Sequence, residues 1–474
     1  MSEPKTAVNE SQKIPMWQKI AYGCGAGGGN VMSTLLASFL LSYYTDTALI
    51  GAAAIGTMFV VCRLLDGVTD FVMGGIVDKT NTRLGKARPW LLICAPLMFL
   101  GIVLILSVPK NWDETAKLVY AYVTYIFLNC IVYTIFGIAH TALLARMTRD
   151  FKDRNTTSTV SSILNNAVGF VVGTMITALQ LSFGWTVTGV ILGVIAGVLI
   201  LITGVFCKEN IGMEEVAHGK PADTVPLKEQ LPAVLKNKYF WIAMVLGALT
   251  LFANANAIGA QIYYCNVVLH DPMYMTTLMS FGMLPGIIIL FFMPYFANKF
   301  SKRAFMSCGA LLMILGFCVV GLADQNRGML LAGTILRSVG IGPMFAGLYA
   351  FCADAADYGE WKFGVRSEGL MSSSQSIGSK VGIGFGSACT AWILAAAGYV
   401  QPAMDMMADG PVGGGLPPMM EQPASVIAAV RFDYGWLGAI ISVVLLIGVL
   451  LMDVEKYMPE IRAALGDKKP PMMG

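Results

Sequence analysis

Long apolar segments recur along the whole chain, and they limit its fold more than any other feature of the sequence. A helix needs about 20 apolar residues to cross the ~30 Å hydrocarbon layer of a membrane. Only 13% of the residues are charged and the mean hydropathy is +0.66, whereas a soluble protein carries about 25% charged residues. The sequence therefore predicts an all-α polytopic membrane protein and excludes a soluble enzyme. Twelve predicted spans cover residues 22–44, 53–76, 90–108, 117–144, 159–181, 185–207, 239–267, 274–297, 304–323, 328–353, 369–399 and 432–452.

The basic residues provide an independent check on this number of spans. With the N-terminus in the cytoplasm, 25 of the 32 Lys and Arg residues fall in cytoplasmic segments, and only Lys110, Lys117 and Arg327 fall in outer loops. Cytoplasmic loops of membrane proteins carry an excess of Lys and Arg, so both termini are predicted to be cytoplasmic. The net charge of +3 gives no reason to expect a nucleic-acid partner.

A polar, proline-containing segment divides the spans into two sets of six. Two six-helix halves joined by a cytoplasmic loop are the architecture of major-facilitator transporters, and we expect a monomer to be the functional unit. The predicted parts are a tail over 1–18, a six-helix bundle over 19–207, a cytoplasmic linker over 208–238, a second six-helix bundle over 239–455 and a tail over 456–474.

Three charged residues lie on one face of the second span. A charged side chain inside the membrane costs about 2.5–3.5 kcal/mol on insertion scales, which makes it a functional candidate. Arg63, Asp66 and Asp70 are spaced three and four residues apart, as neighbours on a helix surface are. Two carboxylates one turn apart repel unless a cation or proton lies between them, and Thr69 adds a hydroxyl oxygen. The pattern favours a site for Na⁺ or H⁺ over a static ion-pair network.

Other candidates for the substrate site are spread over later spans. Lys380, near the middle of the eleventh span, either pairs with an acid of the second span or contacts the substrate. Arg337 in the tenth span either pairs with an acid or anchors an anionic substrate. His140 is more often a hydrogen-bonded packing residue than a ligand at such a position. Phe345 and Tyr349 are one turn apart, and aromatic pairs either pack or stack on a sugar ring.

The first span opens with a run of glycines between Tyr22 and Asn30. Glycine weakens a helix in water, but in a bilayer it permits close approach of neighbouring helices. We therefore expect a tightly packed first span that places Asn30 at a cavity wall.

Charged residues gather after the second span and at the inner end of the tenth. We predict that the two groups pair in one conformation and separate in another, which would close a midplane cavity on its cytoplasmic side. These gate residues are Asp78, Arg83, Lys86, Arg88, Asp354, Asp357 and Arg366.

Other classes of protein fit the sequence less well. A membrane-embedded enzyme would need a nucleophile–base pair or metal ligands, but the three histidines have no HExxH-like spacing and the ten cysteines are scattered singly. The absence of a GxxxxGK[ST] motif argues against direct ATP drive. We expect no enzyme activity, no bound metal other than a coupling Na⁺, and no cofactor.

Four motifs together resemble one transporter family. They are Tyr43–Asp46, the stripe from Arg63 to Asp70, the segment Asp78–Pro89, and Ala353–Gly369 followed by Lys380. Over residues 19–459 the chain resembles the glycoside–pentoside–hexuronide:cation symporters, the family of the melibiose permease and the glucuronide carrier.

The resemblance implies a cation-coupled sugar symporter in a bacterial inner membrane. It implies that Asp66, Asp70 and Thr134 form the cation site and that Lys380 couples this site to the sugar. Thr69 replaces an asparagine that ligates sodium in the melibiose permease, so both Na⁺ and H⁺ stay open as coupling ions.

The resemblance also bears on the substrate. Asn30 and Gly137 stand where the melibiose permease has two sugar-binding aspartates, which argues against galactosides bound in that way. The loss of two acids leaves a more cationic cavity, and with Arg337 this favours a hexuronide such as a glucuronide. The alternatives are a neutral pentoside or oligosaccharide, or a membrane sensor that transports nothing.

Overall fold

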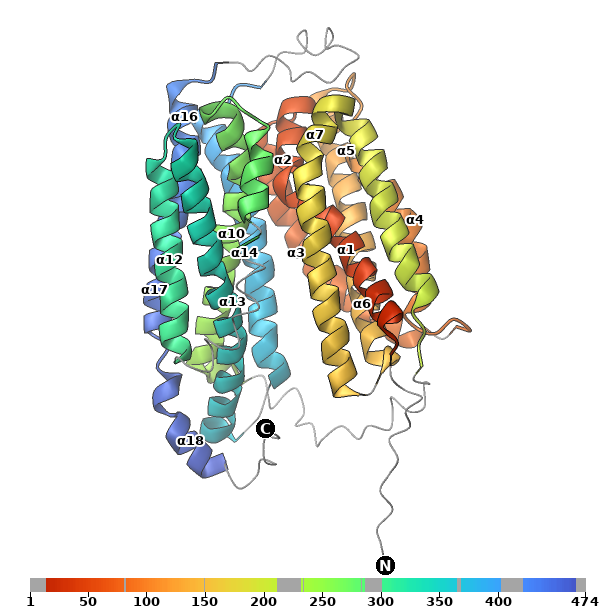
Figure 1. The fold of residues 1–474 in the computed structure, drawn as a ribbon, viewed down its shortest axis with the longest axis vertical. Helices are drawn as coiled ribbons and strands as arrows, with labels where there is room; N and C mark the ends of the chain where they lie inside the picture. The colour runs from red at the N-terminus through yellow and green to blue at the C-terminus, as the bar shows by residue number, and fades with distance from the viewer. Residues whose placement is uncertain are drawn as a thin grey trace, which may run out of the picture. The chain divides into compact units, whose positions relative to one another are not determined.

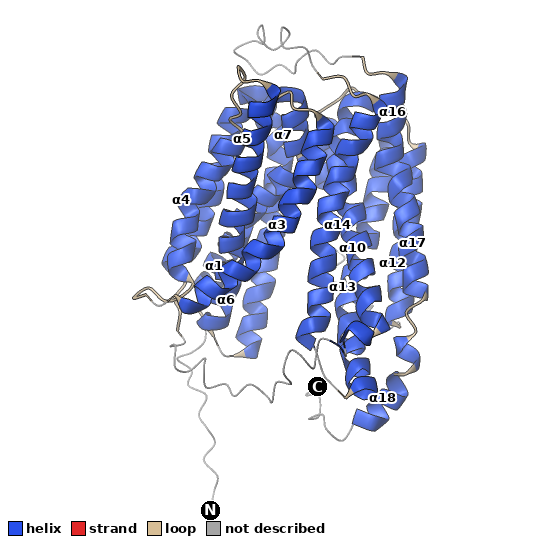
Figure 2. Cartoon of the chain, turned by 180° about the vertical axis from the view of Figure 1, so that it is seen from behind, coloured by secondary structure: helices blue, strands red, loops and turns tan. Residues whose placement is uncertain are grey.

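The computed structural model describes residues 14–80, 82–148, 150–210, 232, 234–282, 284–285, 301–364, 368–401 and 421–465. Every named element within these residues is a helix (Figure 2). The predicted all-α class is therefore confirmed. The side chains of Asp78, Tyr349 and several other helical residues are not among those described, and Arg366 lies outside the described residues.

The elements follow one another as helices of very different length (Figure 1). The first group is α1 (Met16–Ser38), α2 (Leu40–Ser42), η2 (Tyr43–Thr47), α3 (Ala52–Lys79), α4 (Arg88–Ile105), α5 (Glu114–Tyr125), η3 (Ile126–Tyr133), α6 (Thr134–Met147) and α7 (Phe151–Phe206). The second group is α10 (Lys238–Tyr263), η4 (Tyr264–Val268), α12 (Lys302–Leu322), α13 (Arg327–Phe363), α14 (Glu368–Ala397), α16 (Ala424–Arg431), η5 (Phe432–Leu437), α17 (Gly438–Leu450), η6 (Val454–Lys456) and α18 (Met458–Leu465). The segments η2 to η5 are π-helical turns inside longer helices.

The described residues contain nine helices long and apolar enough to span a membrane, or ten if the bent pair Met16–Ser38 and Leu40–Thr47 is one span. One of the nine is nearly all of α7, whose 56 residues would measure about 84 Å as a straight helix, far more than a bilayer. Gly184 interrupts α7 with φ 74° and ψ 173°, a conformation that glycine adopts without a Cβ clash. Two predicted spans, 159–181 and 185–207, meet at this break. The predicted span 274–297 lies partly outside the described residues, so the number twelve stays a prediction.

Polar side chains fix the starts of five helices. Asp113, Asp150, Asn237, Ser301 and Asn326 each accept a main-chain N–H from the first turn that follows, at 3.0–3.3 Å. Such caps satisfy N–H groups that a helix cannot pair internally. The helix that corresponds to the twelfth predicted span begins with α16 at Ala424, eight residues earlier than predicted. Part of the expected outer loop is therefore helical.

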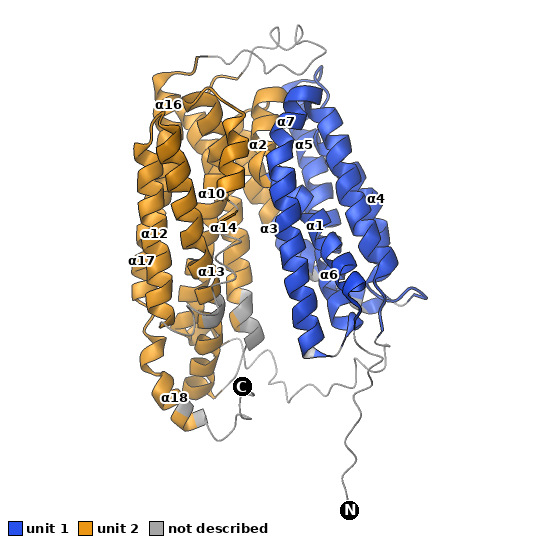
Figure 3. Ribbon diagram, in the orientation of Figure 1, with its two compact units in different colours: residues 1–36, 64–221, 411–415 blue, residues 37–63, 222–410, 416–474 orange. Residues whose placement is uncertain are grey.

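The described residues fall into two compact units (Figure 3). The first contains α1 as far as Leu36, α3 from Leu64 onward, and α4 to α7. The second contains residues 37–63, with α2, η2 and the start of α3, together with α10 and all later helices. Residues 37–63, from the end of the first predicted span and the start of the second, thus belong to the second unit. The predicted division into two six-helix bundles at the 208–238 linker stays a prediction.

Glycines bring helices of each unit into backbone contact. In the first unit, a Cβ at Gly28 of α1 would lie 2.8 Å from the main-chain oxygen of Ala196 in α7. In the second unit, Gly378, Gly382 and Gly386 of α14 face main-chain oxygens of α10, with a four-residue spacing on both helices. Small residues every fourth position let membrane helices approach closely, so the tight packing expected of the glycine-rich first span is confirmed.

Apolar side chains cover the outward faces of the helices. On α3, Leu64 is 65% exposed and Val68 is 62% exposed. On α17, Ile440, Val444 and Ile447 are about half exposed and recur at helical spacing. Exposed apolar residues at this density would be costly in water, and a lipid environment satisfies them.

Candidate functional site

The first unit brings three oxygen-bearing side chains together between α3 and α6. The Thr134 hydroxyl lies 3.2 Å from Oδ1 of Asp66 and 3.1 Å from Oδ1 of Asp70. Asp66 is buried, with 6% of its surface exposed, and Asp70 is half-buried. Two carboxylate oxygens thus converge on one hydroxyl in a low-dielectric setting, where like charges favour binding of a proton or a metal cation.

The Thr69 hydroxyl has a hydrogen-bond partner within its own helix. Its single proton is donated to the main-chain oxygen of Asp66, at 3.1 Å, and not to a carboxylate. This bond is local to α3 and is common for threonine in helices. The hydroxyl oxygen of Thr69 keeps its lone pairs for a cation, so Thr69 stays a predicted ligand. The hydrogen bonds of the described residues join Asp66, Asp70 and Thr134.

Two of the predicted basic residues lie in the second unit. Arg63 packs its aliphatic stem against Gly384 of α14, where a Cβ would lie 2.9 Å from the Arg63 Cγ. Lys380 precedes Gly384 by four residues and is half-buried. Residues four apart share a helix face, so one face of α14 carries Lys380 and receives Arg63.

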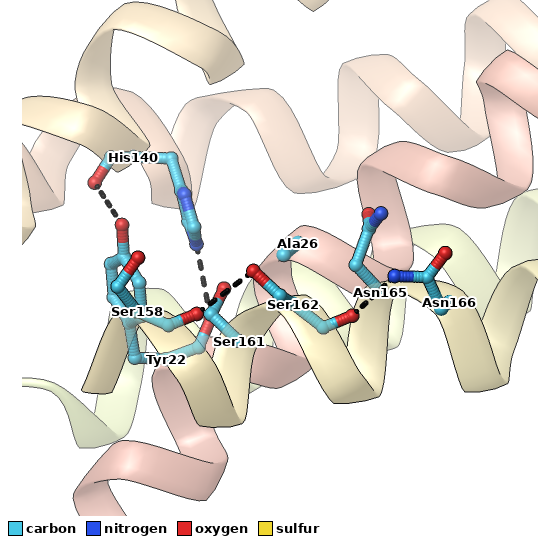
Figure 4. Close-up of a pocket in the computed structure, with 8 residues that line it drawn as sticks. All are labelled: Tyr22, Ala26, His140, Ser158, Ser161, Ser162, Asn165 and Asn166. Atoms are coloured by element: carbon cyan, nitrogen blue, oxygen red, sulfur yellow. Dashed lines mark hydrogen bonds between the residues drawn. The ribbon is translucent and has the colours of Figure 1, made fainter. Parts of the chain in front are cut away.

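A polar cavity of about 260 Å³ lies among α1, α6 and α7 in the first unit (Figure 4). Tyr22 and His140 form one wall, with their rings stacked at 4.0 Å. The Tyr22 hydroxyl donates to the main-chain oxygen of His140 at 3.1 Å, and His140 Nε2 lies 3.0 Å from the main-chain oxygen of Tyr22. His140 is thus both a packing residue and a cavity residue. The lining residues are Tyr22, Ala26, His140, Ser158, Ser161, Ser162, Asn165 and Asn166.

Five of these lining residues come from the start of α7, which the sequence analysis did not single out. Ser158, Ser162 and Asn166 are four residues apart, as are Ser161 and Asn165, so they share one helix face. Nine of the twelve residues from Asn155 to Asn166 are Ser, Thr or Asn. This stripe of hydroxyl and amide side chains in a membrane helix is the sequence signal that could have identified the cavity lining.

Asn30 supports this wall of the cavity indirectly. Its amide Nδ2 donates to the main-chain oxygen of Asn165 at 2.7 Å. The bond ties α1 to α7 beside the cavity. Asn30 therefore positions a lining helix, and it is absent from the lining itself.

Arg337 occupies a different environment from the one predicted. Its side chain is 4% exposed, and its guanidinium lies 5.5 Å from the ring centres of Phe317 in α12 and Tyr434 in η5. Among the described residues it forms no ion pair. A guanidinium over two aromatic faces is a packing group, so we do not assign Arg337 to the substrate site. Phe345 is half-buried on α13, and its pairing with Tyr349 stays a prediction.

The predicted gate residues after α3 are held within the first unit. The carboxylate of Glu209 accepts the main-chain N–H groups of Lys86, Ala87 and Arg88 at 2.8–3.1 Å and pairs with Arg146 at 3.4 Å. A carboxylate at these first N–H groups stabilises the start of α4. The Arg88 guanidinium donates to main-chain oxygens at the end of α7, whereas Arg83 is exposed.

The second group of gate residues also has partners in its own unit. Asp354 of α13 pairs with Lys302 of α12 at 2.6 Å. Asp357 is buried on the same helix. The described residues therefore give Arg88 and Asp354 partners that were not predicted, and the exchange of partners between two conformations stays a prediction.

A further polar cluster in the second unit joins η2, α10 and the residues after α14. The carboxylate of Asp46 accepts hydrogen bonds from Ser42, Thr45 and Tyr399 at 2.7–2.9 Å. The Thr45 hydroxyl also lies 2.8 Å from the Tyr263 hydroxyl. The sequence analysis used this Tyr-Tyr-Thr-Asp run only for its family resemblance, although Tyr263 and Tyr264 begin a similar run.

A helical membrane bundle with two convergent carboxylates and a polar cavity is compatible with a secondary transporter. The profile of the family described as MFS/sugar transport protein matches residues 21–456. An isoprimeverose transporter of Lactiplantibacillus pentosus is 28% identical, with 98% of this chain and 94% of that protein covered. A glucuronide carrier protein homolog of Escherichia coli is 31% identical, with 82% and 86% covered.

Solved structures agree on the fold alone. The nucleoside transporter NupG in its D323A form matches with a TM-score of 0.65 and 15% identity, over 92% of this chain and 99% of that chain. A bacterial homolog of the lysosomal transporter Spinster matches with a TM-score of 0.66 and 12% identity, over 94% and 97%. The chain belongs to the glycoside–pentoside–hexuronide:cation symporter family of the major facilitator superfamily, and it is a sugar symporter of the inner membrane.

Proposed function

We propose that the chain couples entry of a neutral glycoside to a cation held by Asp66, Asp70 and Thr134. The observation that carries the substrate class is the cavity of the first unit, whose eight lining residues include no Asp, Glu, Lys or Arg. Hydroxyl and amide groups both donate and accept hydrogen bonds, which matches the hydroxyls of an uncharged sugar. Because the lining carries no Lys or Arg, it offers the carboxylate of an acidic sugar no ion-pair partner.

The size of the cavity supports a small glycoside. Ligand cavities commonly measure about 300–1,000 Å³, and this one measures about 260 Å³. The stacked rings of Tyr22 and His140 offer an aromatic surface to the apolar face of a sugar ring. A single pentose or hexose unit in the cavity, with the rest of the glycoside outside it, fits these features.

The cation has a direct role in this proposal. With no cation and no sugar bound, the carboxylates of Asp66 and Asp70 repel each other across the Thr134 hydroxyl. A bound Na⁺ or H⁺ removes that repulsion within α3. A Na⁺ that also contacts the Thr134 hydroxyl would tie α3 to α6. If the cation binds one of two conformations more tightly than the other, the cation gradient shifts the equilibrium between them. Sugar that binds the same conformation is then moved at the expense of the gradient. Lys380 on α14 is the residue that we propose couples the two ligands.

An acidic glycoside is the second candidate. The glucuronide carrier protein homolog that is 31% identical favours it, as does the positive charge of Lys380. Arg337 does not add support for an acidic substrate, because its guanidinium packs over Phe317 and Tyr434.

Uptake of labelled sugars into proteoliposomes separates these alternatives. We expect neutral pentosides or disaccharides to accumulate under an inward gradient of Na⁺ or of H⁺, and the ion that drives accumulation identifies the cation. Preferential uptake of hexuronides would replace the neutral-glycoside proposal. No accumulation of any sugar with either gradient would favour the sensor alternative.

Ser162→Ala is expected to raise the KM for the neutral glycoside about 2- to 12-fold with little change in kcat. Ser162 is exposed in the cavity wall, so its loss removes a substrate hydrogen bond worth about 0.5–1.5 kcal/mol without disturbing packing. Initial uptake rates over a range of sugar concentrations measure the effect. Thr159→Val, on the same helix outside the lining, is the matched control. Equal KM values for the two variants would remove the cavity from the proposed sugar site.

The cluster around Asp46 is proposed to act as a latch that holds η2 to α10 and to the segment after α14 in one state of the cycle. Tyr399→Phe removes a hydrogen bond to a carboxylate at 2.9 Å, which is worth about 1.5–3 kcal/mol. We expect amide hydrogen exchange in residues 40–47 to accelerate about 10- to 150-fold. Tyr274→Phe, which removes a hydroxyl bonded to the main-chain oxygen of Arg327, should leave that segment unchanged. Equal exchange in both variants would contradict the proposed latch.

A further inference from the structure

A deeply buried carboxylate lies in the second unit, far along the chain from the α3 site. Asp433 sits in η5, nine residues after the start of α16, and only 2% of its surface is exposed. Carboxylates at such depth in a membrane helix are rare, and they commonly have a functional role. Single π-helical turns such as η5 are also frequent at functional sites.

Neutral groups from two other helices surround this carboxylate. Asn256 of α10 donates from Nδ2 to Asp433 Oδ1 at 2.8 Å, and the same amide nitrogen lies 3.0 Å from Oγ1 of Thr390 in α14. Asn256 and Thr390 are each 1% exposed. Three helices thus meet at one acid through hydrogen bonds in a site closed to water.

No cation within the described residues forms an ion pair with Asp433. Charged and titratable groups occur on several of the elements around it. Within the described residues they include Tyr434 of η5, Tyr263 of α10, Lys380 and Cys389 of α14, Arg431 of α16 and Arg337 of α13. Arg431 pairs with Asp324, and Arg337 lies over the rings of Phe317 and Tyr434. The acid is therefore buried without a fixed counter-charge, which a protein tolerates when the group binds a proton or another cation.

The donors around Asp433 decide between these two ligands. A sodium ion needs several oxygens directed at it, whereas Asn256 presents N–H to the carboxylate. A proton needs only one acceptor for the acid O–H. The Oδ1 atom of Asn256 is buried without a hydrogen-bond partner, and rotation of the amide would turn this acceptor toward Asp433. The Asn256 side chain can serve both charge states of the acid.

We propose that Asp433, Asn256 and Thr390 form a reversible proton-binding site in the second unit. Asn256 donates to the carboxylate when the proton is absent and accepts from the carboxylic acid when it is bound. The site is distinct in sequence and in unit from Asp66 and Asp70. The inference does not depend on which sugar is carried or on the cation bound at α3.

Infrared titration of the purified full-length protein in lipid vesicles tests the proposal directly. The C=O stretch of a protonated carboxyl is resolved from that of a carboxylate, and it is followed as pH rises in the wild type and in Asp433→Asn. We expect one carboxyl component of the wild type to disappear with rising pH and to be missing throughout from Asp433→Asn. Asp46→Asn, which alters a different, half-buried carboxylate of the second unit, should retain that component.

Two further variants keep the proposal testable if Asp433→Asn does not fold. Thr390→Val and Asn256→Leu leave Asp433 in place and remove groups that stabilise its charged form, so the acid component should persist about one to two pH units higher. A spectrum unchanged by Asp433→Asn would overturn the proposal. So would a component that never titrates, or one that Na⁺ removes at constant pH, since the first marks a permanently neutral acid and the second a metal site.

Discussion

Asp66→Asn and Asp70→Asn are each expected to abolish accumulation of sugar against a gradient while exchange of internal for external sugar continues. An amide has nearly the shape of the carboxylic acid, but it neither binds a proton at neutral pH nor offers a full charge to Na⁺. Accumulation should fall by at least tenfold, because coupling requires a cation whose affinity differs between two states. Counterflow and gradient-driven uptake in proteoliposomes measure the two activities separately.

Asp113→Asn provides the control for this pair. Asp113 caps α5, and asparagine caps helices as well as aspartate does, so both activities should be retained. Thr134→Val, which removes the shared hydroxyl, should lower the cation affinity about tenfold and leave maximal uptake nearly intact. Full accumulation by both aspartate variants would show that the cation binds elsewhere.

Gly382→Val is expected to remove most of the correctly folded protein from the membrane. A Cβ at this position would overlap the main-chain oxygen of Ala248 in α10, and backbone atoms cannot turn aside as a side chain can. Overpacking of side chains costs about 1–3 kcal/mol, and a clash with backbone should exceed that range. Fluorescence-detected size-exclusion chromatography and thermal unfolding of the solubilised protein report the loss.

Gly74→Ala is the matched control, because nothing lies within 4 Å of a Cβ placed there. Alanine is favoured over glycine in a helix by about 1 kcal/mol, so Gly74→Ala should fold at least as well as the wild type. A well-folded Gly382→Val protein would mean that α10 and α14 separate more readily than their contact suggests.

The sequence predicted the helical class and most spans because length and apolar content are local properties. It could not place the break in α1 before Leu40 or the early start at Ala424, since both depend on packing against neighbours. The close packing of the first span followed from its glycines alone. The two-unit division was less accessible, because it depends on contacts between residues far apart in the chain.

The candidate sites were predictable to different degrees. Asp66 and Asp70 stand out as acids in an apolar segment, and Thr134 came from the family resemblance. Arg337 looked equally informative, but the face of a helix on which a residue lies does not reveal whether the neighbour is a cavity or an aromatic ring. Ser162 and its neighbours were missed because serine is too common to attract attention singly.

The close packing of α1 has a consequence for how the protein is made. The Thr203 hydroxyl donates to the main-chain oxygen of Ala21 across a separation of 182 residues, and Gly28 meets Ala196. At synthesis rates of roughly 5–20 residues per second, these partners emerge from the ribosome about 9 to 36 s after Ala21. During that interval the glycine-rich helix has none of the α7 contacts that hold it in the finished protein. Although α1 is made before α7, it is therefore completed as a packed helix only after α7 has been made, and until then its retention in the bilayer depends on lipid and on the insertion machinery.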